Sequence, residues 1–120
     1  MKILLVEDDP TIQRALSKLM EKRGAEVDKE SSGKSAIGLI LANDYDKIIC
    51  DLMLQDIHGF DILEEAKQKY SSGQIQKKFI IITAYSSPQV LEKAATYGCQ
   101  LFAKPFDDIQ KVLDVFLEQN

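Results

Sequence analysis

Short apolar runs alternate with helical patterns along the whole chain, and this alternation limits the possible folds more than any other feature. Residues 3–6, 47–50 and 79–82 are almost continuously apolar, which is typical of strands buried on both faces of a sheet. Residues 25–29 alternate between apolar and polar, and the run 101–103 is short, so both are expected at sheet edges. Strands that alternate with helices, joined by right-handed crossovers, predict a parallel sheet with helices on both faces.

Five amphipathic patterns follow these five strands, which makes the predicted unit (βα)₅. The helices are expected to begin near Pro10, Ser32, Phe60, Ser87 and Asp107. The third is expected to reach Tyr70, with residues 71–73 as a flexible connector. Three strands must be central and two at the edges, which selects a flavodoxin-like α/β fold, a doubly wound parallel sheet in the order 2-1-3-4-5. A barrel is excluded because it needs about eight such units.

Length and composition indicate one domain, residues 1–120, of an ordinary soluble protein. The net charge of −4 offers no positive field for nucleic acid or for an anionic membrane surface, so we expect neither as a partner. Cys50 and Cys99 form no CxxC pair and His58 is the one histidine, which excludes a zinc site or a disulfide framework. Two reduced thiols and apolar runs too short for a membrane span point to a cytoplasmic protein.

Polar side chains follow four of the five predicted strands at the place where such a sheet binds ligands, beyond the carboxyl ends of the strands. Glu7 and Asp8 come after the first strand, Asp51 ends the third, Thr83 follows the fourth and Lys104 the fifth. Because parallel strands end at one edge, these carboxylates, the hydroxyl and the ammonium are expected to converge on one small pocket.

Carboxylates packed this closely repel one another unless a cation compensates them. Mg²⁺, which prefers oxygen ligands and retains waters, fits that requirement. A phosphoryl group could share its oxygens among the metal, Thr83 and Lys104, which leaves Asp51 to attack phosphorus. The alternative is that the acids cap helices and Lys104 is their surface partner. For any one residue that alternative is preferable, but their joint position favours a site.

The stretches 3–10, 50–54, 82–84 and 102–106, together with Gly59, carry a family resemblance. In order and spacing they resemble the receiver domains of two-component response regulators, a chemotaxis-regulator-like superfamily, over essentially all 120 residues. The resemblance implies phosphorelay signalling, in which a sensor histidine kinase or a histidine phosphotransfer protein donates a phosphoryl group. It implies a phosphoprotein switch rather than an enzyme, since the domain catalyses only its own phosphorylation and dephosphorylation.

Carried over residue by residue, the resemblance implies that Asp51 is the phospho-acceptor and a metal ligand. Asp8 would bind Mg²⁺ directly and Glu7 chiefly through water, while the backbone carbonyl of Met53 would complete the protein ligands. Asp9 lies one place past the acidic pair and is expected to cap the following helix.

The resemblance also implies a switch. Thr83 and Lys104 would contact the phosphoryl oxygens, and the rotamer of Phe102 would follow Thr83. The bond between Lys104 and Pro105 would be the family's cis peptide, which X–Pro bonds tolerate far better than others do. The surface that changes would be formed by the fourth helix, the fifth strand and the fifth helix of the predicted unit.

One position departs from the family pattern. Many members carry Pro four places after the acceptor, where this chain has Gln55. We expect a looser loop between Asp51 and Gly59, with the chemistry unchanged. His58 in this loop is expected to be a solvated residue, and Tyr85 a partly exposed side chain that screens the pocket.

Two other functions remain as alternatives. A phosphatase of the haloacid-dehalogenase type would need a second carboxylate two places after the nucleophile, where Met53 stands. A degenerate receiver that only docks would not need the acids, Thr83 and Lys104, all of which are present. An effector domain or a target protein would receive the output, and the chain could be a stand-alone regulator or part of a longer protein.

Overall fold

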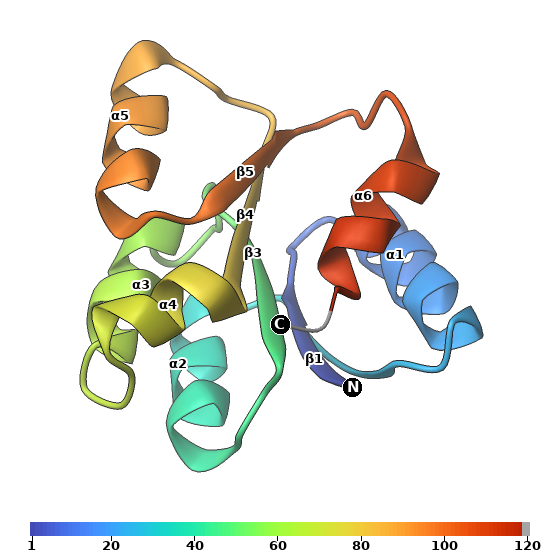
Figure 1. Ribbon diagram of the computed structural model, residues 1–120, viewed down its shortest axis with the longest axis horizontal. Helices are drawn as coiled ribbons and strands as arrows, with labels where there is room; N and C mark the ends of the chain where they lie inside the picture. Colours follow the sequence, from blue (N-terminus) through green and yellow to red (C-terminus); the bar gives the residue numbers. More distant parts are fainter. Residues whose placement is uncertain (119–120) are drawn as a thin grey trace.

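The continuously apolar runs form the centre of a parallel sheet. The structure is a computed structural model that describes residues 1–118. In this part of the chain the strands are β1 (Lys2–Val6), β2 (Glu26–Glu30), β3 (Lys47–Asp51), β4 (Phe79–Thr83) and β5 (Gln100–Ala103). They pair in the order β2-β1-β3-β4-β5, and every pair is parallel (Figure 1). The predicted flavodoxin-like fold and its strand order are confirmed.

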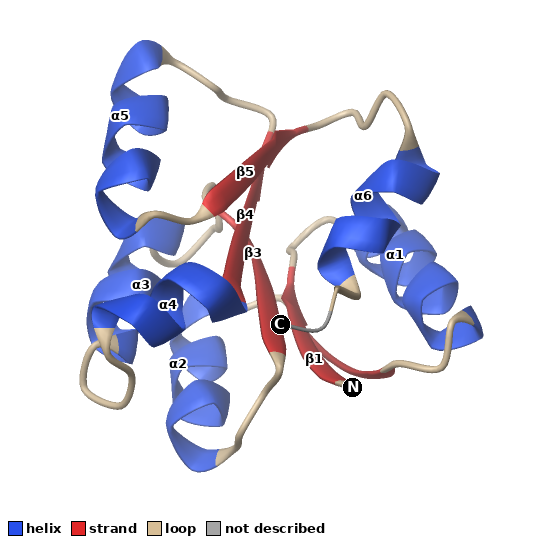
Figure 2. Cartoon of the chain, in the orientation of Figure 1, coloured by secondary structure: helices blue, strands red, loops and turns tan. Residues whose placement is uncertain are grey.

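Helices cover both faces of this sheet (Figure 2). They are α1 (Pro10–Lys22), α2 (Gly33–Ala42), α3 (Gly59–Ala66), α4 (Ser72–Lys78), α5 (Pro88–Tyr97) and α6 (Ile109–Phe116). Alternate residues of each strand point to opposite faces. Ile3 and Leu5 therefore pack in one core cluster with residues of α1 and α6, while Leu4 and Val6 pack in another with residues of α2 and α3. No helix within residues 1–118 has both the length and the apolar character to cross a membrane.

The prediction of five helices was wrong. Residues 1–118 contain six, and the additional one is the short helix α4. The predicted third helix ends at Ala66 rather than Tyr70. Residues 71–73 are not a flexible connector: the Ser71 hydroxyl accepts a hydrogen bond from the Gln74 N–H, and the Gln74 side chain accepts one from the Ser71 N–H. This capping box begins a helix in which Ile75 is the single buried residue. One apolar residue does not make a periodic stripe, so the sequence pattern does not indicate this helix.

The other helix boundaries follow from local chemistry. Asp9 caps α1 as predicted, since its carboxylate accepts hydrogen bonds from two N–H groups of the first turn. Gly98 ends α5 in the left-handed region, with a φ of 72° that favours glycine. The cap of α6 is Asp108 rather than Asp107, because the Asp108 carboxylate accepts hydrogen bonds from Gln110 and Lys111.

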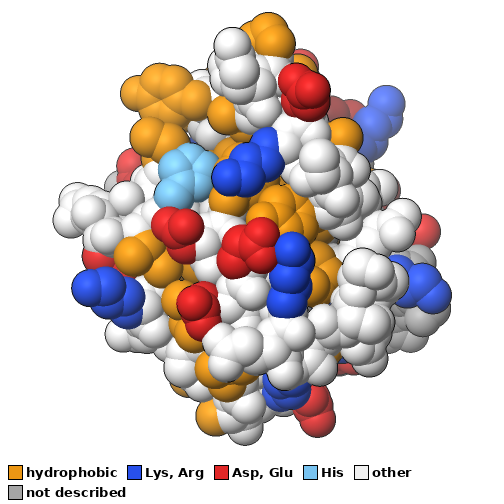
Figure 3. Space-filling view, turned by 90° about the vertical axis from the view of Figure 1, so that its left-hand side faces the viewer, with side chains coloured by type: hydrophobic (Ala, Val, Ile, Leu, Met, Phe, Trp, Pro, Cys, Tyr) orange, Lys and Arg blue, Asp and Glu red, His pale blue; other side chains and the backbone are white. Residues whose placement is uncertain are grey.

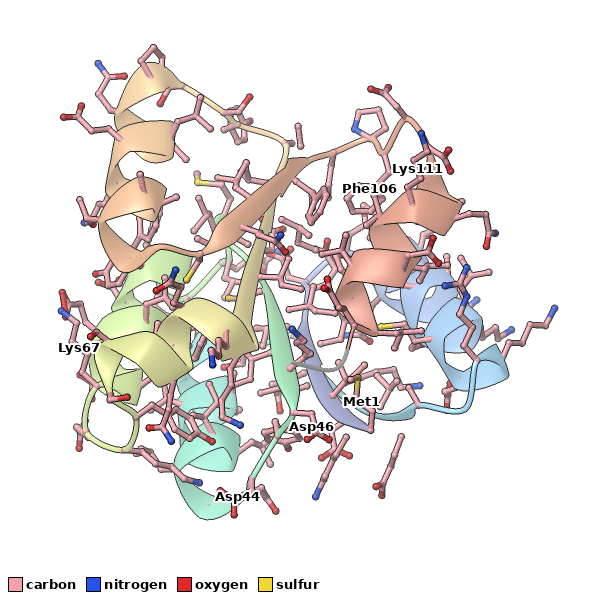
Figure 4. All side chains as sticks on the ribbon, viewed as in Figure 1. Met1, Asp44, Asp46, Lys67, Phe106 and Lys111 are labelled. Carbon is pink, nitrogen blue, oxygen red and sulfur yellow. The ribbon has the colours of Figure 1, made fainter. Side chains whose placement is uncertain are left out.

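The strand register brings the site residues together. Val6 pairs with Cys50, so Glu7 and Asp51 follow paired positions of β1 and β3. Thr83 pairs with Ala103, and its carbonyl accepts a 2.7 Å hydrogen bond from the N–H of Lys104. In Figure 4, Phe106 lies at this carboxyl end of the sheet, whereas Met1 and Asp46 lie near the amino ends of the strands. The polar residues predicted to converge therefore share one edge.

Candidate functional site

A hollow of about 430 Å³ lies at the carboxyl edge of the sheet. It is lined by Glu7, Asp8, Asp9, Ile12, Asp51, Met53, Ala84, Tyr85, Lys104 and Pro105. These residues come from the ends of β1, β3, β4 and β5 and from the first turn of α1. The position agrees with the rule that open parallel sheets bind ligands beyond the carboxyl ends of their strands.

Three carboxylates meet in this hollow. One oxygen atom from each of Glu7, Asp8 and Asp51 lies within 4.8 Å of the others. Glu7 is 1 % exposed and Asp51 is 4 % exposed, while Asp8 is half-buried. Three closely spaced carboxylates make a donor set that suits a hard divalent cation such as Mg²⁺. The residues present therefore fit the metal that the sequence predicts.

Lys104 compensates part of this negative charge. Its Nζ atom donates hydrogen bonds to Oε1 of Glu7 at 2.8 Å and to Oδ2 of Asp51 at 2.9 Å. Burial raises the pKa of Glu7 to about 7, with Lys104 acting against the rise and Asp51 adding to it. Burial alone would lower the pKa of Lys104, but its bonds to Glu7 and Asp51 outweigh that effect and raise it. The ammonium therefore stays charged between two buried carboxyl groups.

Asp51 is held from two sides at the end of β3. Its Oδ2 atom accepts the bond from Lys104, and its Oδ1 atom accepts a 3.2 Å hydrogen bond from the Met53 N–H. Met53 lies on the rim of the hollow, with 49 % of its surface exposed, and pairs with His58 in an antiparallel bridge. The loop after β3 thus folds back on itself directly beside the Asp51 carboxylate.

Thr83 lies beside the hollow without lining it. The residue is fully buried, and its hydroxyl both donates to the Tyr85 carbonyl at 3.1 Å and accepts from the Tyr85 N–H at 3.0 Å. The Tyr85 side chain is 64 % exposed and lines the hollow, in agreement with the screening position expected of it. The hydroxyl is therefore committed to its own backbone turn and not to Asp51.

Phe102 and the peptide after Lys104 complete this side of the site. Phe102 is half-buried, and its ring meets that of Phe116 edge to face, with 5.9 Å between the ring centroids. The Lys104–Pro105 peptide bond is cis, as the sequence resemblance predicts.

The interpretation of His58 as a solvated loop residue was wrong. His58 is the N-cap of α3: its Nδ1 atom accepts a hydrogen bond from the Phe60 N–H, and Asp61 accepts one from the His58 N–H. Its ring also stacks on Phe60 with a centroid separation of 5.2 Å. In Figure 3 the histidine lies between hydrophobic side chains on one side and side chains of both charges on the other. The spacing of a capping box was visible in the sequence, but histidine is not a usual cap.

Comparison with known proteins decides the family. The sequence model of the response regulator receiver domain matches residues 3–115. The chain belongs to this family. Among curated proteins, it is similar to the response regulator ArlR of Staphylococcus saprophyticus, with 36 % identity over 88 % of this chain and 46 % of ArlR. It is also similar to the response regulator SaeR of Staphylococcus aureus, with 32 % identity over 94 % of this chain and 48 % of SaeR. The chain spans about half the length of these relatives.

Solved receiver-domain structures share the fold. The non-phosphorylated HemR receiver domain of Leptospira biflexa has a TM-score of 0.85 and 27 % identity, and the match covers 99 % of this chain and 96 % of that one. The chemotaxis protein CheY4 of Vibrio cholerae, at 23 % identity, has the same fold with a TM-score of 0.81, over 97 % of this chain and 98 % of CheY4. The resemblance seen in the sequence is confirmed. The chain is a receiver domain of two-component response regulators, and such a domain is a phospho-accepting switch in phosphorelay signalling.

One residue of the receiver domain that the sequence did not single out also bears on the site. The carboxylate of Asp56, in the loop after β3, accepts hydrogen bonds from the beginning of α2. The two segments lie more than twenty residues apart, so no local pattern could predict this contact.

Proposed function

We propose that Asp51 is the phospho-acceptor of this receiver domain and takes its phosphoryl group from a phosphohistidine. The observation that carries the proposal is the ammonium of Lys104 between Glu7 and Asp51, with Asp8 completing the carboxylate cluster. In this reaction an Asp51 oxygen attacks phosphorus as the P–N bond of the donor breaks. The electron pair of that bond returns to the histidine ring of the donor, and the product is an acyl phosphate.

The carboxylates of Glu7, Asp8 and Asp51 would hold Mg²⁺, with the backbone carbonyl of Met53 as a further ligand. The metal would supply positive charge opposite the phosphoryl oxygens. Lys104 would supply the second positive charge, because its Nζ atom already contacts the oxygen of Asp51 that faces it. Thr83 would add a hydroxyl donor once it leaves the Tyr85 carbonyl. These residues bind and orient the phosphoryl group, which is the main task in phosphoryl transfer.

The proposed output is a change of the face formed by α5, β5 and α6, which correspond to the fourth helix, fifth strand and fifth helix expected from the sequence. Thr83 and Lys104 stand at the ends of β4 and β5, and Phe102 connects β5 to α6 through Phe116. We propose residues 1–120 as one receiver domain without activity toward other substrates. An effector domain or a separate target protein would read the change.

The proposed partners are a sensor histidine kinase or a histidine phosphotransfer protein, and not nucleic acid or a membrane. We place the protein in the cytoplasm, which is consistent with Cys50 and Cys99 being free and buried thiols. The phosphatase alternative is not supported by the site, because Met53 stands where a second catalytic carboxylate would be required.

Incubation with acetyl phosphate and Mg²⁺, followed by intact-mass measurement, tests the proposal. The wild type should gain one phosphoryl group, and Asp51→Asn should gain none. The matched control Asp44→Asn, at the amino end of the sheet (Figure 4), should be labelled as the wild type is. Labelling of Asp51→Asn, or full labelling of the wild type in EDTA, would overturn the assignment.

A further inference from the structure

The loop after the proposed acceptor is tied to a distant helix through Asp56. Its Oδ1 atom accepts a 2.9 Å hydrogen bond from the Gly33 N–H. Its Oδ2 atom accepts hydrogen bonds from the Ser32 hydroxyl at 2.9 Å and from the Lys34 N–H at 3.0 Å. These donors, led by the Lys34 N–H, hold the pKa of Asp56 well below its usual range. A stable negative charge thus lies at the N-terminus of α2, where the helix dipole favours it.

Apolar packing joins the same two segments. A Cβ atom on Gly33 would lie 2.5 Å from Cγ1 of Ile57 and 3.1 Å from Cδ1 of Leu54, so glycine allows α2 to lie directly against the loop. The base of the loop is equally tight. The Gly59 N–H donates a 2.8 Å hydrogen bond to the Leu52 carbonyl. The loop is therefore closed at its base and anchored at its tip.

The anchored loop is connected to both sides of the carboxylate cluster. On one side, the Met53 N–H donates to Asp51. On the other side, the N–H groups of Ser31 and Ser32 donate to the side chain of Glu30, and the Glu30 carbonyl accepts a 3.0 Å hydrogen bond from the Glu7 N–H. Asp56 thus completes a chain of contacts between the residues that follow β1 and the residues that follow β3.

We propose that Asp56 is a positioning residue for phosphoryl acceptance: it anchors the loop that carries Met53 to α2 and so orders the metal-binding cluster. This inference rests on the proposed role of Asp51. It predicts a restrained loop, in contrast to the expectation that Gln55, in place of proline, leaves the loop loose. The restraint comes instead from the next residue, through a side-chain contact.

The test compares Asp56→Ala with Asp108→Ala, which removes an aspartate cap from α6 in the same way but away from the loop. Amide hydrogen exchange of the metal-free protein is the first readout. In Asp56→Ala, the N–H groups of Met53 and Gly59 should exchange at least about tenfold faster than in the wild type. In Asp108→Ala, they should exchange at the wild-type rate. In Asp56→Asn, which keeps one acceptor oxygen, the exchange rates of these N–H groups should lie between those of the wild type and Asp56→Ala.

The second readout is the Mg²⁺ concentration that gives half-maximal labelling by acetyl phosphate. It should rise by about tenfold in Asp56→Ala, as when a group that supports a metal ligand is lost, and not in Asp108→Ala. If Asp56→Ala does not fold, Ser32→Ala removes one of the three donors and should shift both readouts in the same direction. Equal behaviour of the Asp56 and Asp108 variants would overturn the inference. An unlabelled wild type would overturn the proposed function instead, and the exchange rates would still decide whether Asp56 anchors the loop.

Discussion

The Nζ atom of Lys104 lies 2.9 Å from Oδ2 of Asp51, and both side chains are largely buried. The same ammonium contacts Glu7, so one cation serves two carboxyl groups that would otherwise repel each other. A bound Mg²⁺ would meet the same need. The stability of the metal-free protein should therefore depend on Lys104, and its response to Mg²⁺ should depend on Asp8.

Lys104→Met keeps most of the apolar stem and removes the charge. Because it leaves buried carboxylates without their partner, it should lower the free energy of unfolding of the metal-free protein by about 2 kcal/mol at pH 8. The stabilisation by Mg²⁺ should then be larger than in the wild type. Thermal melts with and without Mg²⁺ measure both effects. Lys67→Met, which removes an exposed ion pair with Glu64 of α3, is the control and should change stability by less than about 0.5 kcal/mol. A metal-free variant as stable as the wild type would refute this account.

Asp8→Ala should have the opposite effect on the stability of the metal-free protein. It removes one of three neighbouring negative charges, so the metal-free protein should gain about 1 kcal/mol while the increment from Mg²⁺ disappears. The adjacent Asp9→Ala is a matched control, because Asp9 caps α1. That variant should lose about 1 kcal/mol and keep the Mg²⁺ increment. Thermal melts of both variants with and without Mg²⁺ measure these changes. An unchanged Mg²⁺ response in Asp8→Ala would contradict the role of Asp8 as a ligand.

The parts of the site that the sequence predicted are those that depend on strand ends. Glu7 and Asp51 follow or end the buried strands β1 and β3, and Lys104 follows the edge strand β5. The ends of parallel strands meet at one edge whatever the helices do. Ile3 and Leu4 likewise had to be buried, because a continuously apolar strand lies between two helical layers. These inferences need only the order of elements along the chain.

The parts that the sequence did not predict depend on side-chain contacts. Helix α4 has a capping box but too little buried apolar surface to give a periodic pattern. Asp56 acts through a segment that is remote in sequence, and His58 caps a helix with a ring nitrogen. The hydroxyl of Thr83 is bonded to the Tyr85 backbone, which no residue pattern specifies. Such contacts are settled only when the whole chain is packed.

The contribution of Asp56 to stability should depend on pH. Its pKa is lowered on folding from an ordinary value of 3.8, so the ionised carboxylate stabilises the fold above that pH, and the contribution is lost as pH falls. The difference in melting temperature between the wild type and Asp56→Ala should be greatest near pH 7. It should shrink as pH falls below about 4. Melts across this range measure it, and a difference that does not vary with pH would show that the charge plays no part.

Thr83 should transmit phosphorylation without being needed for it. In the present state its hydroxyl donates to the Tyr85 carbonyl, so a phosphoryl group on Asp51 must draw it away from that bond. In the proposed switch, this movement would leave space beside β5 into which Phe102 would turn, and the turn would bias the α5–β5–α6 face toward its second state.

Thr83→Ala should therefore accept phosphate at Asp51, while Thr83→Ser, which keeps the hydroxyl, should accept and transmit it. The measurement is the set of amide NMR shifts of α5, β5 and α6 with and without beryllofluoride, a phosphoryl mimic. The wild type and Thr83→Ser should show large changes there, and Thr83→Ala should show changes confined to the hollow. Equally large changes in α5 and α6 of Thr83→Ala would mean that the signal leaves the site by another route, with Lys104 and β5 as the remaining connection.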